Sequence, residues 1–241
     1  MPPKYDLKKI KFSIDEGTLK RAVDLYESEK VKNFKNNLRG YSATVEGTIP
    51  YSVFVSNTDI CRGNCGCYVS QNKNELCKHM VAVAIYAILR GKKIKKEDTL
   101  VEEFVCSKEL GELDKEKLTE IKKEISSAMR FIKAYIGPSS TWFTYTYSLR
   151  EGTRWLESIV SKLPVSKQTS DLVIKILLKL DDKLCRGGVD DSDGAVGSFI
   201  YKSVEILKDF AKLDKNCLKS FKILKKQKTC FDWKKDLIEL I

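Results

Sequence analysis

The chain has 241 residues, and at about 100–200 residues per domain this length suits one large domain or two smaller ones. Hydrophobic residues make up 42% of the sequence and charged residues 32%, a balance that excludes an intrinsically disordered chain. The 44 Lys and Arg residues outnumber the 33 Asp and Glu residues, and the resulting net charge of +11 suits a nucleic-acid partner. The sequence has one histidine and neither a P-loop nor a glycine-rich dinucleotide-binding pattern, which speaks against most familiar enzymes.

Long apolar segments are absent from the sequence. The longest, Met80–Leu89, is shorter than the roughly 18 residues that mark a membrane-spanning helix. No apolar stretch follows the charged N-terminal residues, so no signal peptide is expected. We therefore expect a cytoplasmic protein with no membrane partner.

The sequence before the first cysteine predicts a helix followed by a β-hairpin. Ser13 and Glu16 have the spacing of a capping box, and the apolar residues behind them recur at helical intervals, which predicts a helix over about 14–30. Apolar residues then alternate over 41–45 and 51–55, with turn-forming residues between the two runs. This pattern predicts a two-stranded hairpin, which needs support from its neighbours because an isolated hairpin is marginally stable.

Four cysteines and the only histidine fall in one short segment. Cys65 and Cys67 form a C-x-C pair, and after nine further residues Cys77 and His79 form a C-x-H pair. Structural zinc binds four nitrogen or sulfur ligands in a tetrahedron, and three cysteines with one histidine complete such a set without an open position. We therefore predict one structural Zn²⁺ bound by these four residues. Cys61 could replace one of the ligands, but we interpret it as a spare thiol.

The residues around the cysteines are expected to let the chain fold closely around a metal ion. Gly63 and Gly66 are expected to bend the chain around the metal by adopting positive φ angles. A helix over about 76–90 is expected to begin at Cys77, where the positive end of the helix dipole favours the thiolate, which is the form that binds metal.

The remaining cysteines are scattered singly along the sequence. A disulfide is rare in a cytosolic protein, so we interpret them as small buried apolar side chains. They are Cys106, Cys185, Cys217 and Cys230.

The cysteine and histidine spacing resembles that of a known family, the SWIM zinc finger. The family's pattern of C-x-C, a variable gap and C-x-H is matched by Cys65, Cys67, Cys77 and His79. The resemblance covers about residues 15–90, because the strands before the ligands and the helix after them also look like those of the family. It implies binding to DNA or to proteins, as in the helicase-like ATPases and transposase-related proteins that carry such fingers. This chain has no ATPase motif and so looks like a stand-alone zinc-finger protein.

Helical patterns dominate from about residue 97 onward, where apolar residues recur at helical spacing. A strand over 144–147 is an alternative for part of one helix, because Thr and Tyr alternate there and both favour strands. The predicted helices cover about 113–137, 142–163, 173–184, 200–210, 214–227 and 231–241.

Together these patterns predict an α+β protein that is mostly α-helical. We expect a SWIM-like zinc-finger domain over 1–91, built from a small zinc-bound β-hairpin and helix module. An all-helical domain is expected over 92–241, packed as a helical bundle or as irregular helical repeats. The basic run at 92–96, directly after a glycine, marks the expected boundary.

An acidic loop over 190–194 has part of the sequence of a calcium-binding EF-hand. Aligned on Gly194, Asp191 and Asp193 fit positions 3 and 5 of that loop. The decisive first and last ligands are missing, because Val189 and Ile200 occupy their positions. We therefore expect a polar loop that caps the next helix.

Two groups of basic residues are candidate nucleic-acid contacts, and Tyr68, beside Cys67, is a candidate for stacking on a base. For the group near the cysteines, the alternative is that it balances the negative charge of zinc bound by three thiolates. For the C-terminal group, the alternative is a solvated helix face. The first group is Arg62, Lys73 and Lys78, and the second is Lys219, Lys222 and Lys226, which share one face in an α-helix.

Three classes of function fit the sequence to different degrees. A zinc-stabilised module that binds nucleic acid, DNA in particular, agrees with the net charge of +11 and with the SWIM resemblance. A protein-interaction adaptor in a larger complex is the alternative, because the helical domain offers more surface than a zinc finger needs. An enzyme is not expected, because His79 serves as a ligand and no carboxylate pair or activated serine stands out. No small-molecule substrate is evident.

Overall fold

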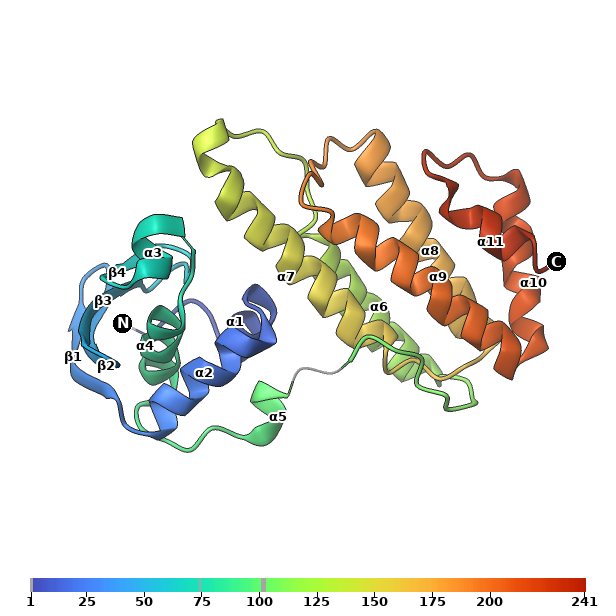
Figure 1. The fold of residues 1–241 in the computed structure, drawn as a ribbon. Coiled ribbons are helices and arrows are strands. Elements are labelled where there is room, and N and C mark those ends of the chain that lie inside the picture. Colours follow the sequence, from blue (N-terminus) through green and yellow to red (C-terminus); the bar gives the residue numbers. More distant parts are fainter. Residues whose placement is uncertain (1, 74, 101–102) are drawn as a thin grey trace. The chain divides into compact units, whose positions relative to one another are not determined.

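A computed structural model describes residues 2–73, 75–100 and 103–241. The chain divides into two compact units, residues 1–101 and 102–241. The first combines a small sheet with helices and the second is helical, so the predicted α+β, mostly α fold is confirmed (Figure 1). Among the described residues, every helix is too short or too polar to cross a lipid bilayer.

The first unit contains a four-stranded antiparallel sheet in the order β1-β2-β3-β4. Its strands are β1 (Val31–Asn37), β2 (Gly40–Glu46), β3 (Pro50–Ser56) and β4 (Gly63–Cys65). Its helices in the described residues are α1 (Leu7–Ser13), α2 (Glu16–Glu27), α3 (Tyr68–Lys73), α4 (Lys78–Leu89) and α5 (Lys96–Thr99).

The predicted hairpin forms the centre of this sheet. β2 pairs with β3 so that Tyr41 lies opposite Val55 and Val45 lies opposite Tyr51. The apolar alternation does not reveal the two flanking strands, because β1 is mostly polar and β4 has only three residues. These flanking strands supply part of the support that an isolated hairpin lacks.

The helix before the sheet begins later than the capping box predicts. Ser13 is the last residue of α1, and its hydroxyl donates a hydrogen bond of 2.7 Å to the carbonyl of Lys9. The N-cap of α2 is Asp15, whose carboxylate accepts a hydrogen bond of 2.8 Å from the backbone N–H of Thr18. The interpretation of Ser13 as the cap is therefore wrong, because an Asp side chain two residues later caps the helix instead.

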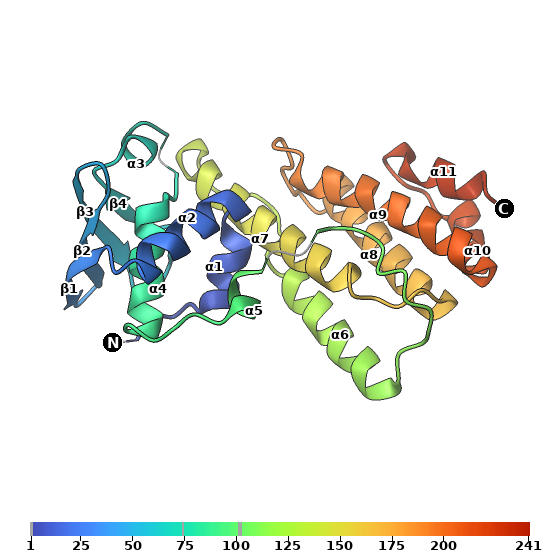
Figure 2. The same cartoon turned by 60° about the horizontal axis from the view of Figure 1, so that its bottom comes forward.

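α4 is the core of the first unit and lies between the sheet and α2 (Figures 1 and 2). Because both sides of the helix are covered, residues 81–85 are all fully buried and apolar. Cys77 is the N-cap of this helix, as predicted, and Arg90 ends it in the left-handed conformation.

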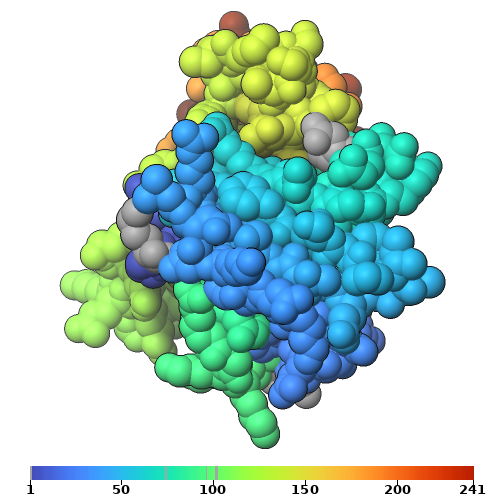
Figure 3. All heavy atoms as spheres, turned by 90° about the vertical axis from the view of Figure 1, so that its left-hand side faces the viewer, coloured from blue at the N-terminus to red at the C-terminus, as the bar shows by residue number. Residues whose placement is uncertain are grey.

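The other face of the sheet is open to solvent. Along β2, Tyr41 and Val45 are fully buried against the core, whereas Ser42 and Thr44 between them point outward and are half-buried. Figure 3 looks onto this outer face, where the blue and light-blue atoms of β1 to β3 form a broad surface.

The second unit is helical, as predicted, and its helices pack as a bundle, which is one of the two arrangements expected. α9 packs against α7 and α8, while α6 packs against α7 and α10 against α8 (Figure 2). Its α-helices are α6 (Lys115–Met129), α7 (Trp142–Val160), α8 (Lys167–Cys185), α9 (Ala195–Leu213), α10 (Leu218–Phe221) and α11 (Lys235–Ile238). Its 3₁₀ helices are η1 (Ser139–Thr141), η2 (Lys215–Cys217), η3 (Lys222–Lys226) and η4 (Asp232–Lys234).

One predicted helix ends early and one strand alternative is wrong, each for a clear reason. α6 ends at Met129 instead of continuing to about residue 137, because Ile132 turns into the core and the backbone N–H of Tyr135 bonds to the carbonyl of Gly188 at 3.0 Å. The alternative strand over 144–147 is wrong, since these residues lie inside α7, where Tyr145 is buried.

The acidic loop before α9 caps that helix, as predicted. The carboxylate of Asp191 accepts hydrogen bonds from the backbone N–H groups of Val196 at 2.8 Å and Gly197 at 2.7 Å. Gly194 is the N-cap residue and has a φ of 71°, a conformation that glycine adopts without strain.

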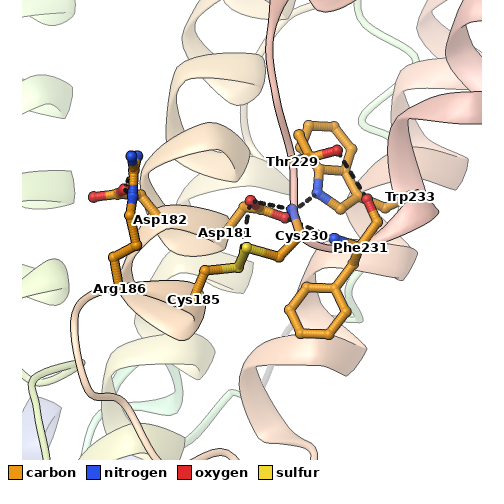
Figure 4. The surroundings of a disulfide bond; sticks show 8 residues. All are labelled: Asp181, Asp182, Cys185, Arg186, Thr229, Cys230, Phe231 and Trp233. Carbon is orange, nitrogen blue, oxygen red and sulfur yellow. Dashed lines mark hydrogen bonds and ion pairs between the residues drawn. A yellow bond between two sulfur atoms is a disulfide. The ribbon is translucent and has the colours of Figure 1, made fainter.

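Two of the four scattered cysteines are buried thiols, and the other two form a disulfide. Cys106 and Cys217 are buried, as predicted. Cys185 and Cys230 form a disulfide that links the end of α8 to the C-terminal segment, with their Cα atoms 6.1 Å apart (Figure 4). The interpretation of these two as free buried side chains is therefore wrong, because the fold brings together thiols that are 45 positions apart in the sequence.

A buried carboxylate holds the same C-terminal segment. Asp181 of α8 accepts a hydrogen bond of 3.0 Å from the backbone N–H of Cys230 and one of 2.9 Å from the indole Nε1 of Trp233 (Figure 4). Asp181 and Trp233 are both buried and cannot bond to water, so each serves as the hydrogen-bond partner that the other needs.

Candidate metal centre

The four predicted zinc ligands converge in the first unit. Cys65 ends β4, Cys67 follows two residues later, and Cys77 and His79 stand at the N-terminus of α4. One donor atom of each lies within 4.8 Å of the donor atoms of the others, and all four residues are buried. The local strand and helix thus bring a C-x-C pair and a C-x-H pair to one point.

The spacing of the donor atoms fits zinc. Nδ1 of His79 lies 3.6 Å from Sγ of Cys65 and 3.9 Å from Sγ of Cys77. A tetrahedral zinc with Zn–S bonds near 2.3 Å and Zn–N bonds near 2.0 Å separates nitrogen from sulfur by about 3.5 Å. Three sulfurs and one nitrogen fill all four positions, so the site holds a structural Zn²⁺.

Backbone hydrogen bonds fix the C-x-C turn. The N–H of Cys65 donates to Oγ of Ser70 at 3.1 Å, and its carbonyl accepts from Nε2 of Gln71 at 2.7 Å. The N–H of Gly66 donates to the carbonyl of Ser52 at 3.2 Å, which ties the turn to β3. α3 and β3 therefore position the first two ligands, although spacing alone does not identify Ser70 and Gln71 as site residues.

Gly63 and Gly66 do not act as predicted, because neither has a positive φ. Gly63 is required for a different reason. A Cβ at this position would lie 2.3 Å from the carbonyl oxygen of Phe54 and 2.8 Å from Cε of Met80. The absent side chain therefore lets β4 approach β3 and α4. A Cβ on Gly66 would meet nothing within 4 Å.

A hydrogen bond links the buried thiols of Cys65 and Cys77. A hydrogen bond from Cys65 lowers the pKa of Cys77 to about 4, and His79 and the backbone N–H of Met80 act in the same direction. The same interaction with Cys77, together with burial, raises the pKa of Cys65. Of Cys65 and Cys77, Cys77 at the helix N-terminus thus supplies a thiolate more readily, mainly because of the hydrogen bond from Cys65.

Cys61 lies outside the group of converging donors. It is half-buried, and its backbone N–H donates a hydrogen bond of 3.0 Å to the carboxylate of Asp59. Within the described residues, the cluster that can hold a metal around His79 contains Cys65, Cys67 and Cys77 but not Cys61.

The basic residues predicted near the cysteines are exposed or half-buried. Arg62 is exposed and lies 3.5 Å from the carboxylate of Asp59. Lys73 at the end of α3 is exposed, and Lys78 at the start of α4 is half-buried. Tyr68, directly after Cys67, is 71% exposed.

The C-terminal basic residues belong to the second unit and are exposed. Lys219 lies in α10, whereas Lys222 and Lys226 begin and end the 3₁₀ helix η3. A 3₁₀ helix has about three residues per turn, so Lys225, not Lys226, lies above Lys222. The single α-helical face predicted for Lys219, Lys222 and Lys226 is therefore not formed.

Residues 51–88 match the family model of the SWIM zinc finger. The matched segment starts in β3, contains all four converging donors and ends within α4. No curated protein and no solved structure matches the chain significantly. The first unit of this chain therefore carries a SWIM zinc finger that binds a structural zinc ion.

Proposed function

We propose that this zinc-finger protein binds nucleic acid, DNA in particular, in the cytoplasm and without catalysing a reaction. The observation that carries the proposal is the exposure of Tyr68, a residue 71% exposed directly beside the zinc ligand Cys67. An exposed aromatic ring can stack on a base, and the neighbouring cations Arg62, Lys73 and Lys78 suit the phosphates that flank it.

The charge of the protein supports the same function. The net charge of +11 favours association with a polyanion. The C-terminal segment over 215–228 adds Lys219, Lys222 and Lys226 as candidate phosphate contacts in the second unit. Contacts of this kind bind without regard to sequence and weaken with salt.

An electrophoretic mobility shift over a salt series tests the proposal with duplex and single-stranded DNA. The zinc-loaded protein is compared with a Cys77→Ser, His79→Ala double variant whose second unit is first shown to be folded by circular dichroism. Binding that weakens with salt and is lost in the variant supports a surface on the finger. Salt-sensitive binding that persists in the variant assigns the contact to Lys219, Lys222 and Lys226. No binding at any salt concentration contradicts the proposal.

A protein-interaction adaptor is the second candidate, and two exposed apolar side chains favour it. Ile136 is 96% exposed and Phe143 is 53% exposed, both close to η1 at the start of α7. Exposed apolar side chains mark contact surfaces for other proteins when they form a patch. This function predicts a partner that co-purifies after nuclease treatment and is lost on the change Phe143→Ser. Co-purification that nuclease abolishes would favour the nucleic-acid function instead.

A further inference from the structure

The sheet of the first unit has one covered face and one open face. α4 packs against all four strands and covers the inner face. The outer face follows from the strand register, because residues directly opposite each other on paired strands point to the same side. One outer row is Lys35, Ser42, Phe54 and Asn64, and the next is Lys32, Thr44 and Ser52.

A bulge in β1 places both lysines on this outer face. The pairing with β2 shifts between Lys32 and Lys35, and Asn33 has a left-handed φ of 52°. As a result Phe34 points inward and stacks on the buried ring of Tyr41, with ring centroids 5.6 Å apart. Without the extra residue, strict alternation would turn Lys35 toward the core.

The outer rows carry positive charge without acidic neighbours in the same rows. Lys32 and Lys35 are exposed, and within the part of the chain that the structure describes neither forms an ion pair. The acidic residue at the end of β2, Glu46, lies 3.5 Å from Lys30. Hydroxyl and amide groups fill the remaining positions of the two rows, apart from one aromatic ring.

That ring belongs to Phe54, at the centre of the outer face. A Cβ on Gly40 would lie 3.0 Å from Cζ of Phe54, so the ring extends over the bare backbone of this glycine. The ring is half-buried and keeps part of its surface in contact with solvent. Packing over Gly40 accounts for the fixed position of the ring, and the solvent-facing side remains available for stacking.

We propose that this open sheet face binds a single strand of nucleic acid. Phe54 stacks on a base, while Lys32 and Lys35 contact phosphates. A single strand is favoured over a duplex because only unpaired bases expose their flat faces to a ring on a sheet. The proposal rests on the proposed nucleic-acid function and adds to it the surface and the class of strand.

The test uses the full zinc-loaded chain and fluorescence anisotropy with a labelled single-stranded DNA of about 12 nucleotides, a length within the range of single-strand binding sites. The same sequence as a duplex serves as the competing probe. The variants are Phe54→Leu, which keeps an apolar cover over Gly40, and the pair Lys32→Gln, Lys35→Gln. The charge-matched control is Lys20→Gln, Arg21→Gln on α2, where both side chains are exposed. Zinc content and thermal unfolding confirm that each variant is folded.

We expect the wild-type chain to bind the single strand at least fivefold more tightly than the duplex. Phe54→Leu should weaken single-strand binding by at least fivefold. The lysine pair should reduce the slope of log affinity against log salt by about 1.4, at about 0.7 for each phosphate contact. The α2 control should stay close to the wild-type affinity.

Three results would overturn the proposal, and they differ in what else they affect. Salt-sensitive binding that neither the Phe54 nor the lysine variants change would exclude this face and leave the proposed function intact. A preference for duplex would exclude the single-strand assignment. No binding by the wild-type chain would contradict the proposed function as well.

Discussion

The ring of Tyr51 stacks on the imidazole of His79, with ring centroids 4.4 Å apart and an angle of 26° between the planes. Tyr51 lies on the inner side of β3 and His79 in the first turn of α4. The contact fixes the plane of the imidazole whose Nδ1 faces the sulfurs of Cys65 and Cys77. A strand residue therefore orients the nitrogen ligand of the zinc site.

The change Tyr51→Ala should weaken zinc binding by about fivefold, since an aromatic pair contributes about 1 kcal/mol beyond the burial of its area. Tyr51→Phe keeps the stacked ring and should bind zinc like the wild type. Competition with a chromophoric chelator measures both affinities. Equal zinc affinity in the alanine and phenylalanine variants would show that the stack does not support the ligand.

The change Gly63→Ala should destabilise the first unit by roughly 1–3 kcal/mol, because the added methyl group overpacks a tight contact. Its Cβ would meet the carbonyl oxygen of Phe54 at 2.3 Å. Gly66→Ala is the matched control, since its Cβ would meet nothing within 4 Å. Thermal unfolding of the zinc-loaded variants measures the difference. If Gly66→Ala cost as much as Gly63→Ala, the close approach of β4 would not be the cause.

Zinc should be released as the pH falls, because protons compete with the metal for thiolates and imidazole. In the metal-free protein, a hydrogen bond from Cys65 lowers the pKa of Cys77 from 9.0 to about 4, so the charged form is favoured in the fold. The stabilisation from this thiolate is fully present above pH 9 and is lost as the pH falls toward about 4. Zinc content after gel filtration at pH 8 and at pH 4 checks this trend. Full retention at the lower pH would contradict it.

The change Asp181→Asn should destabilise the second unit by about 2 kcal/mol, since hydrogen bonds to a charged group contribute about 1.5–3 kcal/mol. An amide cannot accept on both sides, so either the N–H of Cys230 or Nε1 of Trp233 loses its partner. Asp182→Asn is the control, because that side chain is 50% exposed on the same helix.

Denaturant unfolding with and without a thiol reductant measures this cost separately from that of the Cys185–Cys230 disulfide. Equal stability of the Asp181→Asn and Asp182→Asn variants would show that the buried carboxylate does not hold the C-terminal segment.

Most of the zinc site can be predicted from local sequence patterns. Cys65 and Cys67, like Cys77 and His79, are two positions apart, so the chain itself brings each pair close together. The helix that Cys77 caps and the hairpin before Cys65 also follow from short-range periodicity. These are the features that spacing and alternation predict correctly.

The features that the sequence does not predict depend on tertiary contacts. The disulfide joins Cys185 to Cys230 across 45 positions, and no local sequence pattern predicts this pairing. β1 escapes detection because it is mostly polar and because its bulge breaks the alternation between Lys32 and Lys35. The role of Gly63 depends on the backbone of a neighbouring strand, which spacing along the chain does not describe.

The short strand β4 also links zinc binding to the tendency of this protein to aggregate. β4 covers the hydrogen-bonding edge of β3, and it ends at the zinc ligand Cys65. The segment Tyr51–Val55 combines aromatic and β-branched residues without a charge, which is the composition of strands that pair between molecules. An uncovered edge of this kind is a template for such pairing. Loss of zinc should therefore cause this protein to aggregate. The metal thus governs its solubility as well as its fold.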